Sequence, residues 1–96
     1  MTAYLIVDEL TVTNQEKIQE YIIEAGATLK ASGGQLLASG VPEVLEGDWQ
    51  PKRCVLVKFD NMEKLNSWWN SDECQALIPI RNAISESNII TIDGLT

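Results

Sequence analysis

The stretch AYLIVDELTV, residues Ala3–Val12, decides the fold because its apolar residues alternate onto both faces of one strand. Its β-branched and aromatic residues predict a β-strand, and successive residues of a strand point to opposite sides. Leu5 and Val7 therefore share one face. Tyr4 and Ile6 share the other. A sheet built from such strands needs a cover on each face.

Working outward, the segment that follows predicts a helix that ends at a pair of glycines. Thr13 is the expected N-cap, and Glu16 three residues later completes a capping box. Apolar residues spaced by four, three and four form one helix face: Ile18, Ile22, Ala25 and Leu29. The helix is expected to run to about Ser32, where Gly33-Gly34 supplies the left-handed stop.

The rest of the chain predicts three more strands and a second helical region. The strands are Gln35–Val41, Arg53–Phe59 and Ser87–Asp93, and Pro42–Lys52 is a long hairpin connection between the first two. Asp60 or Asn61 caps a helix with the stripe Met62, Leu65 and Trp69, and Ser71-Asp72 restarts a helical segment through about Ser85. Pro79 lies inside that segment and predicts a kink or break. Of the adjacent Trp68 and Trp69, one is expected in the core and the other in a cleft or interface.

The order β-α-β-β-α-β over residues 1–96 predicts a single α+β domain, a ferredoxin-like sandwich with a four-stranded antiparallel sheet. Both helical regions would cover one face, and the other face is also apolar. Because most soluble oligomers are symmetric dimers, we expect a homodimer through this open sheet face.

Composition excludes several classes of function. The chain has 96 residues, a formal net charge of −7 and no histidine. Its acidity argues against nucleic-acid partners and anionic membranes, and the lack of imidazole removes Ser-His and Cys-His nucleophile pairs, histidine zinc sites and a proximal-His haem. We expect no metal and no cofactor. Two cysteines, no signal peptide and no apolar membrane span together predict a cytoplasmic protein.

The central segment resembles the DUF-1330 family. The run GGQLLASG at Gly33–Gly40 is similar to that family's GGRYLARG-like strand, and EVLEGDWQPKR at Glu43–Arg53 is similar to its E-V-L-E-G-x-W-x-P-x-R segment. The likeness covers essentially the whole chain and implies a dimeric α+β barrel. It implies no reaction. Other proteins with this barrel fold include cofactor-free monooxygenases, muconolactone isomerases, haem-dependent peroxidases and ligand-sensing domains.

The sequence departs from the family pattern at three places. Gln35 stands where Arg is common, Cys74 stands where Tyr is common, and one residue is added near Glu9. A β-bulge at Asp8-Glu9 would absorb the added residue and turn both carboxylates toward the open face. Lys58 would share that face, near the matching end of the adjacent strand Arg53–Phe59. One carboxylate could then serve as a general base, and the alternative is a solvated strand end with a surface ion pair.

Four further residues are candidates for ligand binding. Trp49 could close over a ligand, although a dimer contact is the commoner role. Arg53 could hold a carboxylate or pair with a neighbouring acid in the loop. Arg81 could reach an anionic substrate or extend along apolar surface toward solvent. Ser39 could point its hydroxyl into the barrel or be structural.

Two functions remain open on these residues. The first is a small-molecule binding or sensing domain, with the ligand between sheet and helices. The second is a cofactor-free enzyme, isomerase- or monooxygenase-like, that abstracts a proton with a carboxylate base. A dimer that serves as a protein–protein adaptor, without a pocket, is a third possibility.

Overall fold

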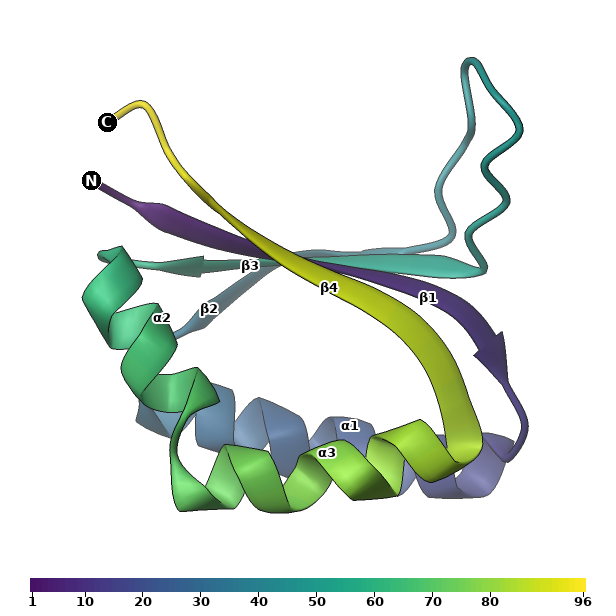
Figure 1. Ribbon diagram of the computed structural model, residues 1–96, viewed down its shortest axis with the longest axis horizontal. Helices are drawn as coiled ribbons and strands as arrows, with labels where there is room; N and C mark the ends of the chain where they lie inside the picture. The colour runs from purple at the N-terminus through teal and green to yellow at the C-terminus, as the bar shows by residue number, and fades with distance from the viewer.

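The computed structural model describes residues 1–96 and has one antiparallel sheet with helices on one face (Figure 1). The elements in chain order are β1 (Ala3–Val12), α1 (Gln15–Ala31), β2 (Gln35–Gly40), β3 (Arg53–Phe59), α2 (Met62–Trp69), α3 (Asp72–Ile84) and β4 (Ser85–Asp93). The strands lie in the order β2-β3-β1-β4. The predicted ferredoxin-like sheet is therefore confirmed, with the second helical region divided in two.

The core lies between the sheet and the helices. Its buried residues come from β1, β3, α2 and α3: Ala3, Leu5, Val57, Phe59, Leu65, Trp68 and Cys74. The rings of Phe59 and Trp68 lie 5.6 Å apart between centroids, within the range of a favourable aromatic pair. Of the two adjacent tryptophans, Trp68 is buried in the core and Trp69 is partly buried beside it, so the prediction that one of them is a core residue is confirmed.

Helix α1 begins one residue later than predicted. Asn14, not Thr13, is the N-cap, and its side chain accepts a hydrogen bond from the Lys17 backbone at 3.0 Å. Thr13 instead donates its backbone N–H and its hydroxyl to the Ile84 carbonyl, where α3 meets β4. The capping box with Glu16 does not form, because Lys17 occupies the third helical position.

The glycine stop of α1 is confirmed. Gly33 has a φ of 86°, which favours glycine. The Gly34 N–H donates to the Leu29 carbonyl at 2.8 Å and the Gly33 N–H to that of Lys30 at 3.2 Å, the two bonds of a Schellman motif.

The second helical region breaks at Asn70 and Ser71, which confirms the predicted restart at Ser71-Asp72. Ser71 caps α3 by accepting from the Cys74 backbone at 3.2 Å. Pro79 lies inside an unbroken α3, so the predicted break near it was wrong. The turn at Ser71 lets α2 cross the end of the sheet while α3 runs beside α1 (Figure 1).

Strand β1 carries a bulge, one residue later than expected. Glu9 pairs with Ser87 but Thr11 pairs with the next residue, Glu86, so Leu10 is the extra residue. Up to the bulge, β1 alternates regularly. As a result Asp8 lies on the open face and Glu9 lies on the face toward the helices. The prediction that both carboxylates turn to the open face was therefore wrong.

The open face is apolar and uncovered over much of its area. The pairing register places five large apolar residues there: Tyr4, Ile6, Leu56, Ile90 and Ile92. Ile90 is 58% exposed and Ile92 is 56% exposed. Residues 41–52, the β2–β3 loop, rise from this face on the side opposite the helices (Figure 1).

No helix is long and apolar enough to cross a membrane.

Candidate functional site

A cavity of about 40 Å³ lies between the sheet and the helices. It has room for roughly three water molecules. Twelve residues line it, and ten of them are hydrophobic. The other two are Thr28 and Arg81. An apolar hollow with a few converging polar groups is the usual form of a small-molecule site.

Two helix faces bring the polar groups to this cavity. Tyr21, Ala25 and Thr28 follow one another on α1 at spacings of four and three, so they share one side of that helix. Arg81 lies four residues after Leu77 on α3 and therefore on the same side. Because α1 and α3 run side by side, these two faces meet over the sheet (Figure 1).

Arg81 is a half-buried cation with no carboxylate partner. The only ion pair in the structure joins Lys64 and Asp60 at 3.3 Å, on the exposed surface. The Arg81 Nη1 group donates to the Tyr21 hydroxyl at 3.3 Å, and its guanidinium carbon lies 5.9 Å from the centre of the Tyr21 ring. Its Nε is buried and has no partner. A buried donor left unpaired costs about 1–3 kcal/mol, and more when the group is charged.

The other polar groups of the cavity are neutral. The Thr28 hydroxyl has no proton left to donate, since it donates to the Ala25 carbonyl at 2.8 Å, and it also accepts from Trp68 Nε1 at 3.2 Å. Burial raises the pKa of the Cys74 thiol, and the positive charge of Arg81 opposes part of that rise. The thiol therefore stays protonated at neutral pH and contributes no anion to balance Arg81.

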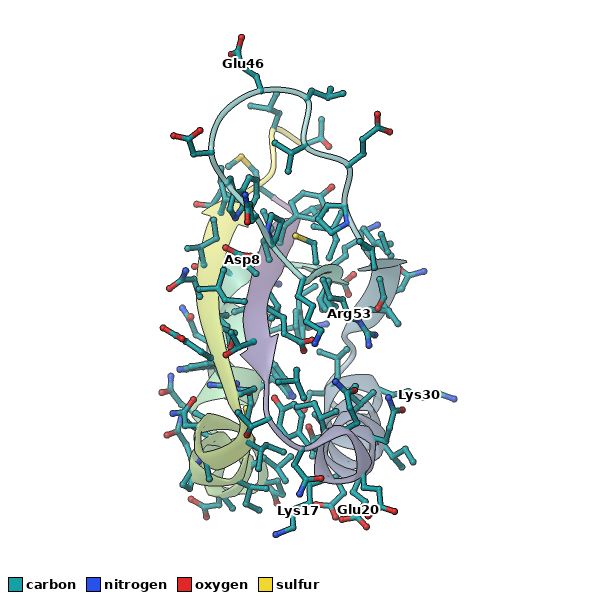
Figure 2. The ribbon with its side chains drawn as sticks, turned by 90° about the vertical axis from the view of Figure 1, so that its right-hand side faces the viewer. Asp8, Lys17, Glu20, Lys30, Glu46 and Arg53 are labelled. Carbon is teal, nitrogen blue, oxygen red and sulfur yellow. The ribbon has the colours of Figure 1, made fainter.

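Asp8 and Trp49 meet on the opposite side of the sheet, the open face. Trp49 Nε1 donates to Asp8 Oδ2 at 2.9 Å, while Asp8 Oδ1 is buried and has no partner. Figure 2 shows Asp8 on β1 and Glu46 at the far end of the loop. Cys54 is paired across from Asp8, and burial raises the pKa of its thiol, with a smaller contribution from the Asp8 charge. Trp49 thus lies outside the cavity that contains Arg81.

Lys58 shares the open face but not the end of the strand expected for it. The antiparallel register places it opposite Tyr4, four residues along β1 from Asp8. At about 3.3 Å per residue this separates the two positions by roughly 13 Å. The predicted group of Asp8, Glu9 and Lys58 is therefore not assembled, because Glu9 lies on the other face and Lys58 at the other end.

Arg53 and Ser39 form a third location, on the helix side of the sheet. Ser39 is paired with Val55, which packs against the core, so its hydroxyl does not point to the open face. The Arg53 Nε donates to Ser39 Oγ at 3.1 Å, and Nη2 donates to the same oxygen. Arg53 lies toward the helices in Figure 2 and forms no ion pair with the acidic residues of the loop.

Arg81, a candidate from the sequence, lines the cavity, and so do Tyr21 and Thr28, which were not singled out. The spacing of Tyr21, Ala25 and Thr28 is the signal that could have identified this face. No group of three or more Cys, Asp or Glu side chains is placed to hold a metal ion.

Solved structures share this fold at low sequence identity. A protein of unknown function from Rhodopseudomonas palustris matches with a TM-score of 0.78 and 13% identity, over 99% of this chain and 83% of that one. A dimeric ferredoxin-like protein of unknown function from Thermobifida fusca matches with a TM-score of 0.67 and 11% identity, over 96% and 90%. A mutant of SnoaB, a cofactor-independent oxygenase from Streptomyces nogalater, matches with a TM-score of 0.72 and 9% identity, over 99% and 94%.

These likenesses show the fold alone. No curated protein matches the chain. The family described as "Domain of unknown function (DUF1330)" matches residues 2–95, almost the whole length. The match agrees with the resemblance seen in the central segment. The chain therefore belongs to the DUF1330 family.

Proposed function

We propose that the protein is a homodimeric small-molecule binding domain, which takes its ligand between the sheet and the helices and pairs with a second copy through the open sheet face. The observation that carries the binding role is the cavity, which is apolar except for Thr28 and Arg81. Its volume of about 40 Å³ suits a ligand of a few heavy atoms.

Dimerisation is supported by the open face. Apolar residues on both sides of a sheet are expected where each side is covered, and here only one side has helices. The Thermobifida fusca protein of the same fold is described as dimeric. Asp8 Oδ1, buried without a partner on this face, would gain a possible donor from a second copy.

Native mass spectrometry of freshly purified protein, compared with the denatured mass, tests both parts of the proposal. We expect a dimer with a reproducible extra mass that leaves on denaturation. Ala25→Leu fills the cavity from α1 and is expected to abolish the extra mass. Ala27→Leu, at an exposed position of the same helix, is the matched control and is expected to keep it.

The other outcomes contradict the proposal at different points. A bare dimer in every variant would favour the adaptor role without a small molecule. An extra mass that survives Ala25→Leu would place the ligand elsewhere. A monomer would overturn the pairing of open faces.

A cofactor-free enzyme is the second candidate, and one observation favours it. Asp8 has one carboxylate oxygen bound to Trp49 and one buried and free, so it could take a proton from a ligand on the open face. SnoaB shows that the fold occurs in a cofactor-independent oxygenase.

The enzyme hypothesis is tested by deuterium exchange. Once a ligand is identified, NMR in heavy water would measure deuterium exchange into it. Asp8→Asn should abolish this exchange and Glu9→Gln should preserve it, and equal rates in both variants would exclude Asp8 as the base.

A further inference from the structure

We infer that the cavity recognises a carboxylate, and that the ligand is a short-chain carboxylic acid in its ionised form. The inference rests on the proposed binding role of the cavity and adds the chemical class of its ligand. The inference is based on Arg81, a positively charged residue that lines a hydrophobic cavity and forms no ion pair.

Every element packed around Arg81 supplies neutral groups. Helix α1 presents Tyr21, α3 presents Cys74, and β1 and β4 present the aliphatic residues Val7 and Ile89. Glu9 also lies on the helix side of the sheet, but it makes no ion pair with Arg81. No acidic residue is among those that line the cavity. The protein itself therefore leaves the positive charge unbalanced, and an anion is the species that balances it.

Two donors are free to receive that anion. Arg81 Nε is buried without a partner, and the Tyr21 hydroxyl accepts from Arg81 Nη1 while its own proton remains free. These groups belong to one hydrogen-bonded pair on adjacent helices, so their donors lie close together. Two neighbouring donors beside a fixed positive charge suit the two oxygens of a carboxylate. The aliphatic and aromatic walls then suit a short apolar chain.

Thermal unfolding with a matched pair of probes tests the inference. Isobutyrate and isobutyramide have nearly the same shape and differ in charge. We expect isobutyrate to raise the unfolding temperature with a dependence on concentration that saturates, and isobutyramide to have no effect at equal concentration. In Arg81→Gln we expect the isobutyrate affinity to fall at least tenfold.

Arg53→Gln is the matched control, because Arg53 is the only other arginine and its guanidinium is bound to Ser39. It should keep the full response to isobutyrate.

The unfolding temperature without ligand tells whether Arg81 serves binding or has a structural role. Without ligand, Arg81→Gln should unfold at the same or a higher temperature than the wild type, because it removes an unbalanced charge from the cavity. A large loss of stability without ligand would assign Arg81 a structural role and overturn the inference.

Failure of the inference and failure of the proposed function give different results. Equal effects of isobutyrate and isobutyramide, unchanged in Arg81→Gln, would leave a binding cavity but overturn recognition of charge. An isobutyrate effect that persists in Arg81→Gln without saturating would be a general salt effect and would also overturn it. No effect of either probe would overturn the carboxylate class. If native mass spectrometry then finds no bound mass, the binding role fails as well.

Discussion

Trp49 is tied to Asp8 across 41 residues of sequence, and this bond holds the β2–β3 loop against β1. The Lys52 N–H adds a second tie by donating to the Glu9 carbonyl at 2.8 Å. Trp49→Phe removes the donor and keeps an aromatic ring. We expect a loss of about 1 kcal/mol in the free energy of unfolding. We also expect several-fold faster cleavage of the loop after Glu43 and Glu46 by a glutamate-specific protease.

A double-mutant cycle with Asp8→Ala checks that this bond is responsible. If the bond carries the effect, Trp49→Phe adds little to the cleavage rate once Asp8 is gone. Fully additive effects of the two changes would show that Trp49 holds the loop by other contacts.

Cys74 is expected to make the free energy of unfolding depend on pH in the alkaline range. Burial raises the pKa of this thiol from its ordinary value of 9.0, so the folded protein holds the proton more tightly than the unfolded chain does. The resulting stability is complete below about pH 9 and is lost as the pH rises through the folded-state pKa. Urea unfolding above pH 9 should therefore show a shallower fall of stability with pH in Cys74→Ala than in the wild type. Parallel slopes would exclude Cys74 as a contributor.

At the scale of elements, α1 offers a paired test of its glycines. Gly33 ends the helix with a φ of 86°, and a side chain there would be strained. Gly26 lies inside the same helix, and a Cβ added there would have no other atom within 4 Å apart from its chain neighbours and the helix's own backbone. We expect Gly33→Ala to cost about 1 kcal/mol of unfolding free energy and Gly26→Ala to gain about 0.5–1 kcal/mol. If urea unfolding shows that both substitutions stabilise or both destabilise the protein, the helix does not end at Gly33 as described.

The sequence allowed most elements to be predicted, because alternation and glycine placement are local signals. Local sequence could not decide whether Thr13 or Asn14 is the N-cap, because both are good capping residues. Thr13 does not cap the helix, since its hydroxyl donates to the Ile84 carbonyl, 71 residues away in the sequence. The new helix start at Ser71-Asp72 was predicted correctly, whereas the break expected near Pro79 is absent, because α3 accommodates this proline.

For the whole molecule, the open face carries the most direct prediction. Ile90 is 58% exposed on this face, on the edge strand β4 and opposite Ile6 of β1. In a dimer formed through it, Ile90→Glu would bury a charge without a partner. We expect the dimer dissociation constant to rise at least a hundredfold, measured by light scattering after size-exclusion chromatography.

Ile23→Glu is the matched control for this experiment. Ile23 is 72% exposed on α1, on the helical side of the molecule, and its replacement should leave the dimer unchanged. If Ile23→Glu dissociates the dimer and Ile90→Glu does not, the copies pair through their helices.

The candidate site was harder to predict than the fold, because faces depend on register. A bulge at Leu10 in place of Asp8-Glu9 leaves Glu9 on the helix side. Antiparallel pairing likewise moves Lys58 to the far end of the strand from Asp8. Arg81 was less sensitive to such shifts, since its place on a helix face follows from spacing alone.

The two ends of the chain meet at one corner of the sheet, where the Thr2 N–H donates to the Thr96 carbonyl at 2.9 Å (Figure 1). Strand β1 must therefore find β4 across almost the whole chain, from Ala3 opposite Asp93 to Val12 opposite Ser85. Contacts so distant in sequence slow folding. A circular permutant that joins the two ends by a short linker and opens at the tip of the β2–β3 loop would make these strands a hairpin. Its folding in stopped-flow experiments should be faster than that of the natural order, since the slowest pairing would become a local one.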